Sequence, residues 1–384
     1  MLRNRLACTS RCGQRLLIIM RELPLSRHIM PCCRGKGPRS SLHNVLALDF
    51  FPPYLLFMII AGIDEAGYGP MLGPLVVSVS VFRVPDGTGA SLWEALSPLV
   101  VRKPLEGCIA VNDSKKIYKR NKGLQSLEEG LLPFLAAKHG KTPRDLRALL
   151  NQVARRGKAS ADSYLDDYPW YRDQNLKLPV DSFSGLIDRR GKQLLKRMEE
   201  AGVEFLGLAA IPVEVAEFNQ GISQLNNKAK VSFKAVGSLL KRIWKQFPDE
   251  QVDVMIDRQG GRTRYSRILF KSISPRGIHI DEQGPENSSY RLTRPGSRKK
   301  DGEEFRVSFA KGSEEKNLCV ALASMLAKYL RELHMSVFNR YWKGYEKGLK
   351  PTAGYVQDAR RFLGETEKLR EQLETDPKLL IRSR

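Results

Sequence analysis

Two adjacent acidic residues end an aliphatic run early in this chain. Residues 59–63 read Ile-Ile-Ala-Gly-Ile, Asp64 and Glu65 follow, and a turn rich in glycine and proline covers 67–74. The run predicts a buried strand, and alternating valines and serines over 75–82 predict a second strand beside it. A sheet would thus carry two carboxylates to its edge, where their charge costs free energy unless a cation or hydrogen bonds compensate it. The alternative is a strand and turn whose acids are simply solvated.

The residues around this pair form one long motif. It reads Gly-Ile-Asp-Glu-Ala-Gly over 62–67 and continues as Gly69-Pro70 and Gly73-Pro74. This motif resembles the first signature of the ribonuclease HII family. The resemblance implies an α/β, ribonuclease H-like fold, with a mixed central sheet flanked by helices and a helical C-terminal part. It also implies an endonuclease that cuts the RNA strand of RNA–DNA hybrids, or ribonucleotides embedded in DNA.

Three further segments resemble signatures of the same family, in the family's order. The first is Asp-Ser-Lys at 113–115, which alone could be an ordinary helix start with Asp113 or Ser114 as N-cap. The second is Ile-Ser-Gln-Leu-Asn at 222–226, ahead of a predicted helix. The third is Leu-Ala-Ser-Met-Leu-Ala-Lys at 322–328, inside a helix that apolar spacing predicts over 317–333.

The resemblance implies a two-metal site in which four acids hold Mg²⁺ or Mn²⁺ through hard oxygen ligands. Asp64 and Glu65 match the first two acids. Because successive strand residues face opposite sides, both can act only if the chain bends at Glu65, which the following Ala-Gly would ease. Asp257, at the end of a strand predicted over 252–257, matches the third acid, and Asp253 on the same strand face is its alternative.

The fourth acid departs from the family's pattern. The family has an aspartate after Lys-Gly, whereas this chain has Ser313 there, and Glu314 stands ten residues before Ser324. Glu314 is therefore the predicted catalytic and metal-binding residue, and Glu315 is its rival. The same stretch also suits a helix start without metal, with Ser313 as N-cap and both glutamates in the first turn.

The resemblance also implies substrate contacts. Gly67, Tyr68 and Gly69 stand where bacterial members have Gly-Arg-Gly, a loop that reads the ribose 2′-hydroxyl largely through its backbone. Tyrosine can stack on a sugar or base, although losing an arginine weakens the grip on phosphate. Tyr355 matches a Gly-Tyr that packs on the sugar beside the scissile phosphate, but the Gly-Thr and histidine expected after it are absent. The other matches to signature residues are Lys115, Lys311, Ser324 and Lys328.

Several segments lie outside these signatures. Residues 138–205 read as a helical insertion, and 258–306 as a second one, rich in arginine and lysine and broken by glycine and proline, which predicts a hairpin or mobile arm. The catalytic domain would span 58–363, followed by a charged tail over 364–384. Residues 1–57 are arginine-rich and poor in acids, and we place them outside the fold. They could be a targeting segment, but translation beginning at Met58 is simpler.

Composition narrows the class of protein. The 384 residues are 42% hydrophobic, enough for a sizeable core, and the net charge of +22 suits a polyanionic partner, nucleic acid first and an anionic membrane second. Four of the six cysteines lie in the first 33 residues, at spacings that match no usual zinc finger, so we expect a reducing, cytoplasmic location. The most apolar run, residues 54–63, is about half the length of a membrane-spanning helix.

The leading hypothesis is a monomeric Mg²⁺- or Mn²⁺-dependent endonuclease of DNA replication or repair. Its partner would be an RNA–DNA hybrid or a ribonucleotide-containing duplex DNA, and cleavage would leave 3′-hydroxyl and 5′-phosphate ends. A second hypothesis is a catalytically impaired protein that binds RNA–DNA hybrids or RNA on the same fold. A third is another nuclease or resolvase that acts on DNA without ribonucleotides. An active enzyme requires Glu314 beside the other acids, whereas both glutamates pointing away would favour the binding protein.

Overall fold

The computed structural model describes residues 57–85, 91–154, 162–258, 260–296 and 304–383. The N-terminal segment expected to lie outside the fold, with its four cysteines, is outside these residues except for Phe57. Among the described residues, no helix is long and apolar enough to cross a membrane.

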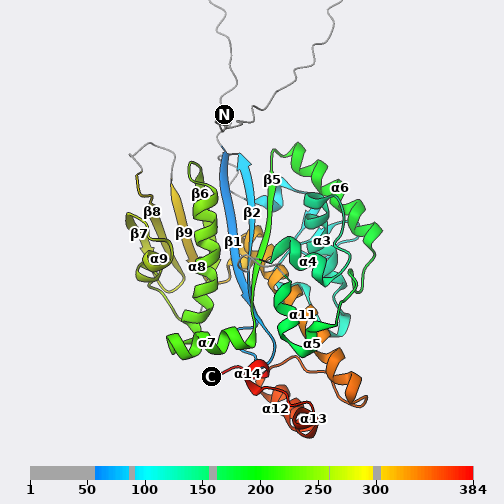
Figure 1. The fold of residues 1–384 in the computed structure, drawn as a ribbon. Coiled ribbons are helices and arrows are strands. Elements are labelled where there is room, and N and C mark those ends of the chain that lie inside the picture. Colours follow the sequence, from blue (N-terminus) through cyan, green and yellow to red (C-terminus); the bar gives the residue numbers. More distant parts are fainter. Residues whose placement is uncertain (1–56, 86–90, 155–161, 259, 297–303, 384) are drawn as a thin grey trace, which may run out of the picture. The chain divides into compact units, whose positions relative to one another are not determined.

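The centre of the fold is a seven-stranded mixed sheet with the order β5-β2-β1-β6-β9-β8-β7 (Figure 1). Strands β1, β6 and β9 run parallel to one another, and the other neighbouring strands are antiparallel. The strands predicted over 59–63, 75–82 and 252–257 are confirmed as parts of β1, β2 and β6. The strands span Phe57–Ala66 (β1), Leu75–Pro85 (β2), Glu204–Val213 (β5), Gln251–Asp257 (β6), Gly277–Gln283 (β7), Asn287–Thr293 (β8) and Phe305–Ala310 (β9).

Helices cover both faces of this sheet, as the mixed α/β class predicts. Helix α11 lies on one face, and α8, with α7 and α9 near it, lies on the other (Figure 1). These four helices span Val215–Leu225 (α7), Lys228–Gln246 (α8), Ser266–Ile273 (α9) and Leu318–Tyr345 (α11). The alternation in β1 explains the layering, because Ile59, Ala61 and Ile63 are buried in the cluster on the α8 side.

Helix α11 approaches the sheet unusually closely. A Cβ atom at Gly62 would lie 2.1 Å from the backbone nitrogen of Val320, so only glycine fits there. In β2, the Ser80 hydroxyl donates to the carbonyl oxygen of Cys319 at 2.8 Å, and Ser78 donates to that of Ala323 at 2.6 Å. These contacts fix the first turns of α11 against the ends of β1 and β2, where the paired acids lie.

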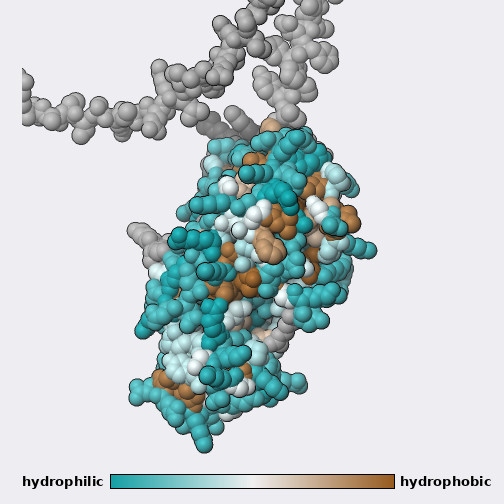
Figure 2. Space-filling view, turned by 90° about the vertical axis from the view of Figure 1, so that its right-hand side faces the viewer, coloured by the Kyte–Doolittle hydropathy of each residue, from teal (hydrophilic) through white to brown (hydrophobic). Residues whose placement is uncertain are grey.

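The segment 138–205 is helical, as expected, and packs into the core on the α11 side. It places Leu149, Tyr171 and Leu194 in the same hydrophobic cluster as α11. Figure 2 views the molecule from this side and shows a mostly hydrophilic surface broken by smaller hydrophobic patches. Helix α3 (Gln125–His139) leads into the segment 138–205. The helices within the segment are α4 (Leu146–Val153), η2 (Ser163–Asp167), α5 (Pro169–Arg172) and α6 (Ser184–Glu200).

In its described part, the segment 258–306 contains a hairpin, the first of its two predicted forms, and is not a mobile arm. After α9, strands β7 and β8 form an antiparallel hairpin, and β8 pairs with β9. The hairpin thereby extends the central sheet. Ring stacking of Tyr265 on Phe309, with centroids 3.6 Å apart, ties the segment to the core because both side chains are buried.

The C-terminal stretch 364–384, expected as a charged tail, is folded in its described part. This stretch contains two further helices, and it buries Leu380 and Arg382 to 1% and 3% exposure. The remaining elements are α1 (Leu92–Ala95), β3 (Val100–Val101), β4 (Ile109–Ala110), α2 (Ser114–Ile117), η1 (Arg120–Lys122), α10 (Ser313–Lys316), α12 (Val356–Glu365), α13 (Glu367–Gln372) and α14 (Pro377–Leu380).

Candidate active site

Parallel pairing brings three acids together at one edge of the sheet. Ile63 of β1 pairs with Ile256 of β6, so Asp64 and Asp257 follow side by side. Both point to the α11 side, opposite to the buried residues that alternate with them. Strand β9 ends beside Asp257, and Glu314 lies in the short helix α10 just beyond it. We call Asp64, Asp257 and Glu314 the carboxylate site.

Asp64 is only 7% exposed. Its carboxylate accepts a hydrogen bond from the backbone N–H of Glu65 at 2.7 Å and lies within hydrogen-bond reach of Ser324 in α11. Burial, followed by the charges of Glu65 and Asp257, raises the pKa of Asp64 well above its usual value. Ionised Asp64 is therefore unfavourable in this environment without a compensating cation.

Asp257 and Glu314 influence each other's charge in the site. Burial, then the charge of Glu314 and a hydrogen bond between the two carboxyl groups, raise the pKa of Asp257 to about 7. The backbone N–H of Ser313 donates to Asp257 Oδ1 at 3.1 Å and opposes this shift. Glu314 is 6% exposed, and its Oε2 atom receives no hydrogen bond from any described residue. Such a buried acceptor without a donor is unusual and suits a cation.

The structure separates Glu314 from its rival, Glu315. Glu315 is exposed, and its Oε2 atom lies 2.9 Å from Lys116 Nζ. Asp253, the alternative to Asp257, shares its strand face but lies four residues earlier in β6, where it lines a separate cavity of about 110 Å³ with Trp93 and Cys319. The geometry therefore favours Asp257 and Glu314 over both alternatives.

The chain does not bend at Glu65, contrary to the sequence expectation. Strand β1 stays paired with β2 through Ala66, and the bend comes at Gly67, whose φ is +88°. Glu65 therefore leaves the strand on the side opposite Asp64. Its charge still raises the pKa of both Asp64 and Asp257, so it lies at the border of the carboxylate site.

The glycine loop, residues 67–74, lies beside the predicted tyrosine segment. The backbone N–H groups of Met71 and Leu72 donate to the carbonyl oxygen of Gly354 at 2.7 and 3.2 Å. This contact places Tyr355, 52% exposed, next to the loop that carries Tyr68, 39% exposed. Each of the two contacting segments thus carries an exposed aromatic ring, and exposed rings are what stacking on sugars or bases requires.

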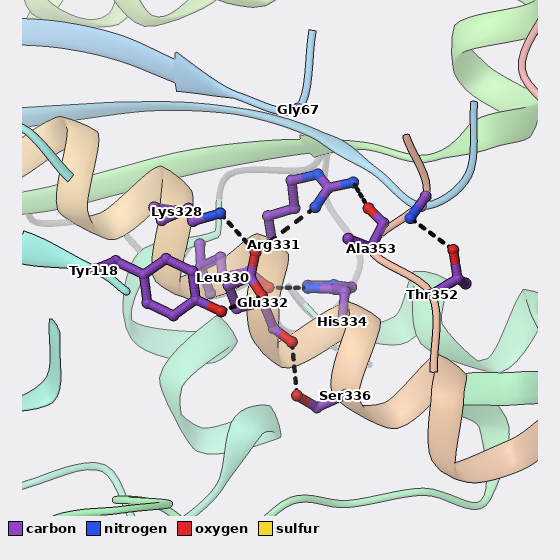
Figure 3. A network of polar contacts seen from close by, with 12 residues as sticks. Gly67, Tyr118, Lys328, Leu330, Arg331, Glu332, His334, Ser336, Thr352 and Ala353 are labelled. Carbon is purple, nitrogen blue, oxygen red and sulfur yellow. Dashed lines mark hydrogen bonds and ion pairs between the residues drawn. The ribbon is translucent and has the colours of Figure 1, made fainter. Parts of the chain in front are cut away.

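Of the three signature lysines, Lys115 lies nearest the acids, with Nζ 3.7 Å from Glu314 Oε1. Lys328 is engaged elsewhere, since its Nζ donates to Glu332 Oε1 at 2.7 Å (Figure 3). Lys311 lies 3.8 Å from Glu286 at the surface. Ser324 lies between Asp64 and the Asp-Ser-Lys segment, with its hydroxyl 3.0 Å from that of Ser114.

The side chains of the carboxylate site are of the type that binds divalent metals, but they are not spaced as metal ligands in this structure. Within the described residues, no three histidine, cysteine, aspartate or glutamate side chains are grouped closely enough to hold a metal ion. The donor set nevertheless consists of carboxylate oxygens, which Mg²⁺ and Mn²⁺ prefer. The Oε2 atom of Glu314, which lacks a donor among the described residues, and the charge of Glu314, which raises the pKa of Asp257, mark where a cation would relieve charge repulsion.

Sequence reasoning missed Arg331 and Arg382 near the site, and it included Arg262 only as one residue of the basic segment 258–306. Arg262 lies close enough to Tyr68 to lower the pKa of its hydroxyl, against the raising effects of burial and Glu65. Arg331 and Arg382 are buried below the glycine loop. The signal for Arg331 was a charged residue within an otherwise apolar helix face, three positions after Lys328. For Arg382 the sequence offers no local signal.

Comparison with known proteins gives matches among solved structures alone. No family model and no curated protein matches this chain. Ribonuclease HII of Archaeoglobus fulgidus, solved in complex with PCNA, is 15% identical with a TM-score of 0.36, over 85% of this chain and 95% of that one. Ribonuclease H2 from Pyrococcus horikoshii is 14% identical with a TM-score of 0.34, over 84% and 92%. A Bst ribonuclease HIII solved with Mn²⁺ is 13% identical with a TM-score of 0.36, over 86% and 67%.

These matches are ribonucleases HII and HIII. Ribonuclease HII is also the family that the sequence motifs resemble. With identities of 13–15% and TM-scores of 0.34–0.36, these matches say nothing about the activity of this chain.

Proposed function

We propose that this protein is a divalent-metal-dependent endonuclease that cleaves RNA–DNA hybrids or DNA containing ribonucleotides. The observation that carries this proposal is that buried Asp64 and Glu314 and partly buried Asp257 lie at one edge of the sheet, where Oε2 of Glu314 receives no hydrogen bond from a described residue. Buried acids with raised pKa values in such a cluster are typical of functional sites. Three of the segments that resemble ribonuclease HII signatures, at 62–67, 113–115 and 322–328, contact one another at the same place.

In this proposal, the three acids of the carboxylate site hold the metal ions, and Glu65 adds its negative charge from the border of the site. Two bound divalent ions would activate the attacking water and neutralise the leaving oxygen. Asp64 and Asp257, on neighbouring parallel strands, provide rigid ligands, and the Ser313 N–H keeps Asp257 oriented. Lys115, 3.7 Å from Glu314, supplies a positive charge that can hold Glu314 or contact a substrate phosphate.

The glycine loop would read the ribonucleotide. The backbone N–H groups of Tyr68 and Gly69 donate to no acceptor in the described part of the chain. They are therefore available to a hydroxyl or phosphate oxygen. The exposed rings of Tyr68 and Tyr355 would pack on neighbouring sugars, and the loop N–H groups would bind the 2′-hydroxyl, which is the group that distinguishes RNA from DNA.

The position of Glu314 weighs against a catalytically impaired binding protein. That hypothesis expects both glutamates to point away from the other acids. Glu315 is exposed and pairs with Lys116, but Glu314 is buried, and its charge raises the pKa of Asp257. In this proposal, Glu314 replaces the usual fourth aspartate from the neighbouring position.

The test is cleavage of two labelled duplexes, one with a single ribonucleotide and one with an RNA–DNA hybrid strand, in Mg²⁺, Mn²⁺ or EDTA. We expect cleavage with either metal, 3′-hydroxyl and 5′-phosphate products, and none in EDTA. Glu314→Gln should reduce the rate at least 100-fold, since a lost metal ligand removes several kcal/mol of transition-state stabilisation. Glu315→Gln is the matched control and should stay within about threefold of wild type. No cleavage of either duplex by wild type, with binding intact, would overturn the proposal.

A further inference from the structure

Two buried arginines support the glycine loop from below. Arg382, which is 3% exposed, donates through Nη1 to the carbonyl oxygen of Gly67 at 2.6 Å and through Nε to that of Gly73 at 2.8 Å. Its backbone N–H also donates to the carbonyl oxygen of Met71 at 2.9 Å. One residue near the end of this sequence therefore holds three carbonyl groups of the loop.

Arg331 of α11 makes the second support. It is 1% exposed, and its Nη2 donates to the carbonyl oxygen of Ala353 at 2.9 Å, as Figure 3 shows. Nη2 also lies 3.4 Å from the carbonyl oxygen of Leu72. A Cβ atom at position 67 would lie 2.6 Å from Arg331 Nε, so the guanidinium packs directly against Gly67. Arg331 thus joins the glycine loop to the segment that carries Tyr355.

These contacts fix the orientation of the peptide groups in the glycine loop. The carbonyl groups of Gly67, Met71 and Gly73 point inward to Arg382, while the N–H groups of Tyr68 and Gly69 have no acceptor within the described residues. A loop held in this way presents hydrogen-bond donors to an incoming ligand. It would bind an oxygen acceptor and disfavour a group that offers only a C–H.

Burying two guanidinium groups together is costly, which argues that the arrangement serves a purpose. Burial, followed by the charge of Arg331, lowers the pKa of Arg382 to about 9. Burial also lowers the pKa of Arg331. Hydrophobic residues could fill this space at lower electrostatic cost, but they could not hold several carbonyl oxygens in one orientation.

We propose that Arg382 and Arg331 are positioning residues that orient the glycine loop for recognition of the ribose 2′-hydroxyl. The inference rests on the proposed function, because the loop is taken to read the substrate. It assigns a role to the stretch 376–383, which docks beside α7: Asn219 donates through Nδ2 to the carbonyl oxygen of Ile381 at 2.9 Å, and the N–H of Ser383 donates to Asn219 Oδ1 at 2.6 Å.

The test compares Arg382→Ala, Arg382→Lys and the matched control Arg360→Ala, an exposed arginine of α12. We expect Arg382→Ala to raise KM for the single-ribonucleotide duplex at least tenfold and to change kcat less than threefold, because the carboxylate site is untouched. Methylguanidinium added to Arg382→Ala should restore part of the affinity. Lysine should give an intermediate KM, since one ammonium cannot bridge the carbonyls of Gly67 and Gly73. Arg360→Ala should match wild type.

Amide hydrogen exchange on the metal-free proteins makes the test independent of nuclease activity. Exchange at Met71 and Leu72, whose N–H groups donate to the carbonyl oxygen of Gly354, should be at least tenfold faster in Arg382→Ala than in wild type or Arg360→Ala. Asn219→Ala, which loosens the docked segment without removing a buried charge, should shift exchange and KM in the same direction if Arg382→Ala does not fold. Unchanged loop exchange and unchanged KM in a folded Arg382→Ala would overturn the inference. If wild type cleaves no duplex, the proposed function fails, and loop exchange still decides whether Arg382 orients the loop.

Discussion

Replacing Asp257 by asparagine should stabilise the metal-free protein at alkaline pH, although it removes a proposed metal ligand. The pKa of Asp257 is raised from 3.8 to about 7, chiefly by burial and by Glu314. An asparagine Oδ1 can still accept the Ser313 N–H, and its amide can donate to Glu314 without carrying charge. The substitution therefore keeps the hydrogen bonds and removes the like-charge repulsion.

The sign of the effect follows from linkage. A carboxyl group with a raised pKa in the folded state binds more protons when the protein is folded, so ionising it reduces stability as pH rises. The penalty is absent near pH 4, grows between pH 4 and 7, and is constant above pH 7. A shift from 3.8 to about 7 corresponds to an upper limit of about 4 kcal/mol. Because Asp257 is only partly buried, solvent screening reduces this, and we expect about 1–3 kcal/mol.

The assay is urea unfolding in EDTA at several pH values from 4 to 8. Asp257→Asn and wild type should have similar stability at pH 4, and the variant should be about 1–3 kcal/mol more stable at pH 8. Saturating Mn²⁺ should raise the stability of wild type at pH 8 and have a much smaller effect on the variant. Asp358→Asn is a control of opposite sign, because hydrogen bonds from Arg361, Ala353 and Thr352 outweigh burial and lower the pKa of Asp358. A stability difference for Asp257→Asn that does not grow with pH would refute the reasoning.

Two further substitutions test the packing and the substrate surface. Gly62→Ala should destabilise the protein by several kcal/mol, measured by thermal melting, because the new Cβ atom would meet the α11 backbone at 2.1 Å. A variant that melts within 2 °C of wild type would show that α11 moves away easily. Tyr355→Phe should keep nearly wild-type KM for the single-ribonucleotide duplex, whereas Tyr355→Ala should raise it about tenfold, because stacking contributes about 1–3 kcal/mol per base. Equal KM values for the two variants would exclude a stacking role.

Features that depend on the local pattern of a single strand or helix could be predicted from the sequence. The aliphatic run before Asp64 and the strand that ends at Asp257 indicated two neighbouring acids, and the parallel pairing of β1 and β6 confirms that they lie together. The mixed α/β class was likewise predictable, since strands and amphipathic helices could be recognised from their periodicity.

Features that depend on contacts between distant parts of the chain could not be predicted from the sequence. Glu314 and Glu315 are equivalent in a first helical turn, and only the position of β9 beside Asp257 directs one inward. The absence of a bend at Glu65 depends on pairing with β2, which continues through Ala66. Arg382 and Gly67 are 315 residues apart in the sequence, and no local pattern indicates their contact.

The most direct test of this account is the position of bound Mn²⁺ in crystals grown with an uncleaved ribonucleotide-containing duplex. Anomalous scattering would locate the ions. The account predicts Mn²⁺ between Asp64, Asp257 and Glu314, with the phosphate beside the ribonucleotide as a further ligand and the 2′-hydroxyl at the N–H groups of Tyr68 and Gly69. A duplex bound away from the glycine loop, or Mn²⁺ absent from these carboxylates in a substrate-bound crystal, would contradict it.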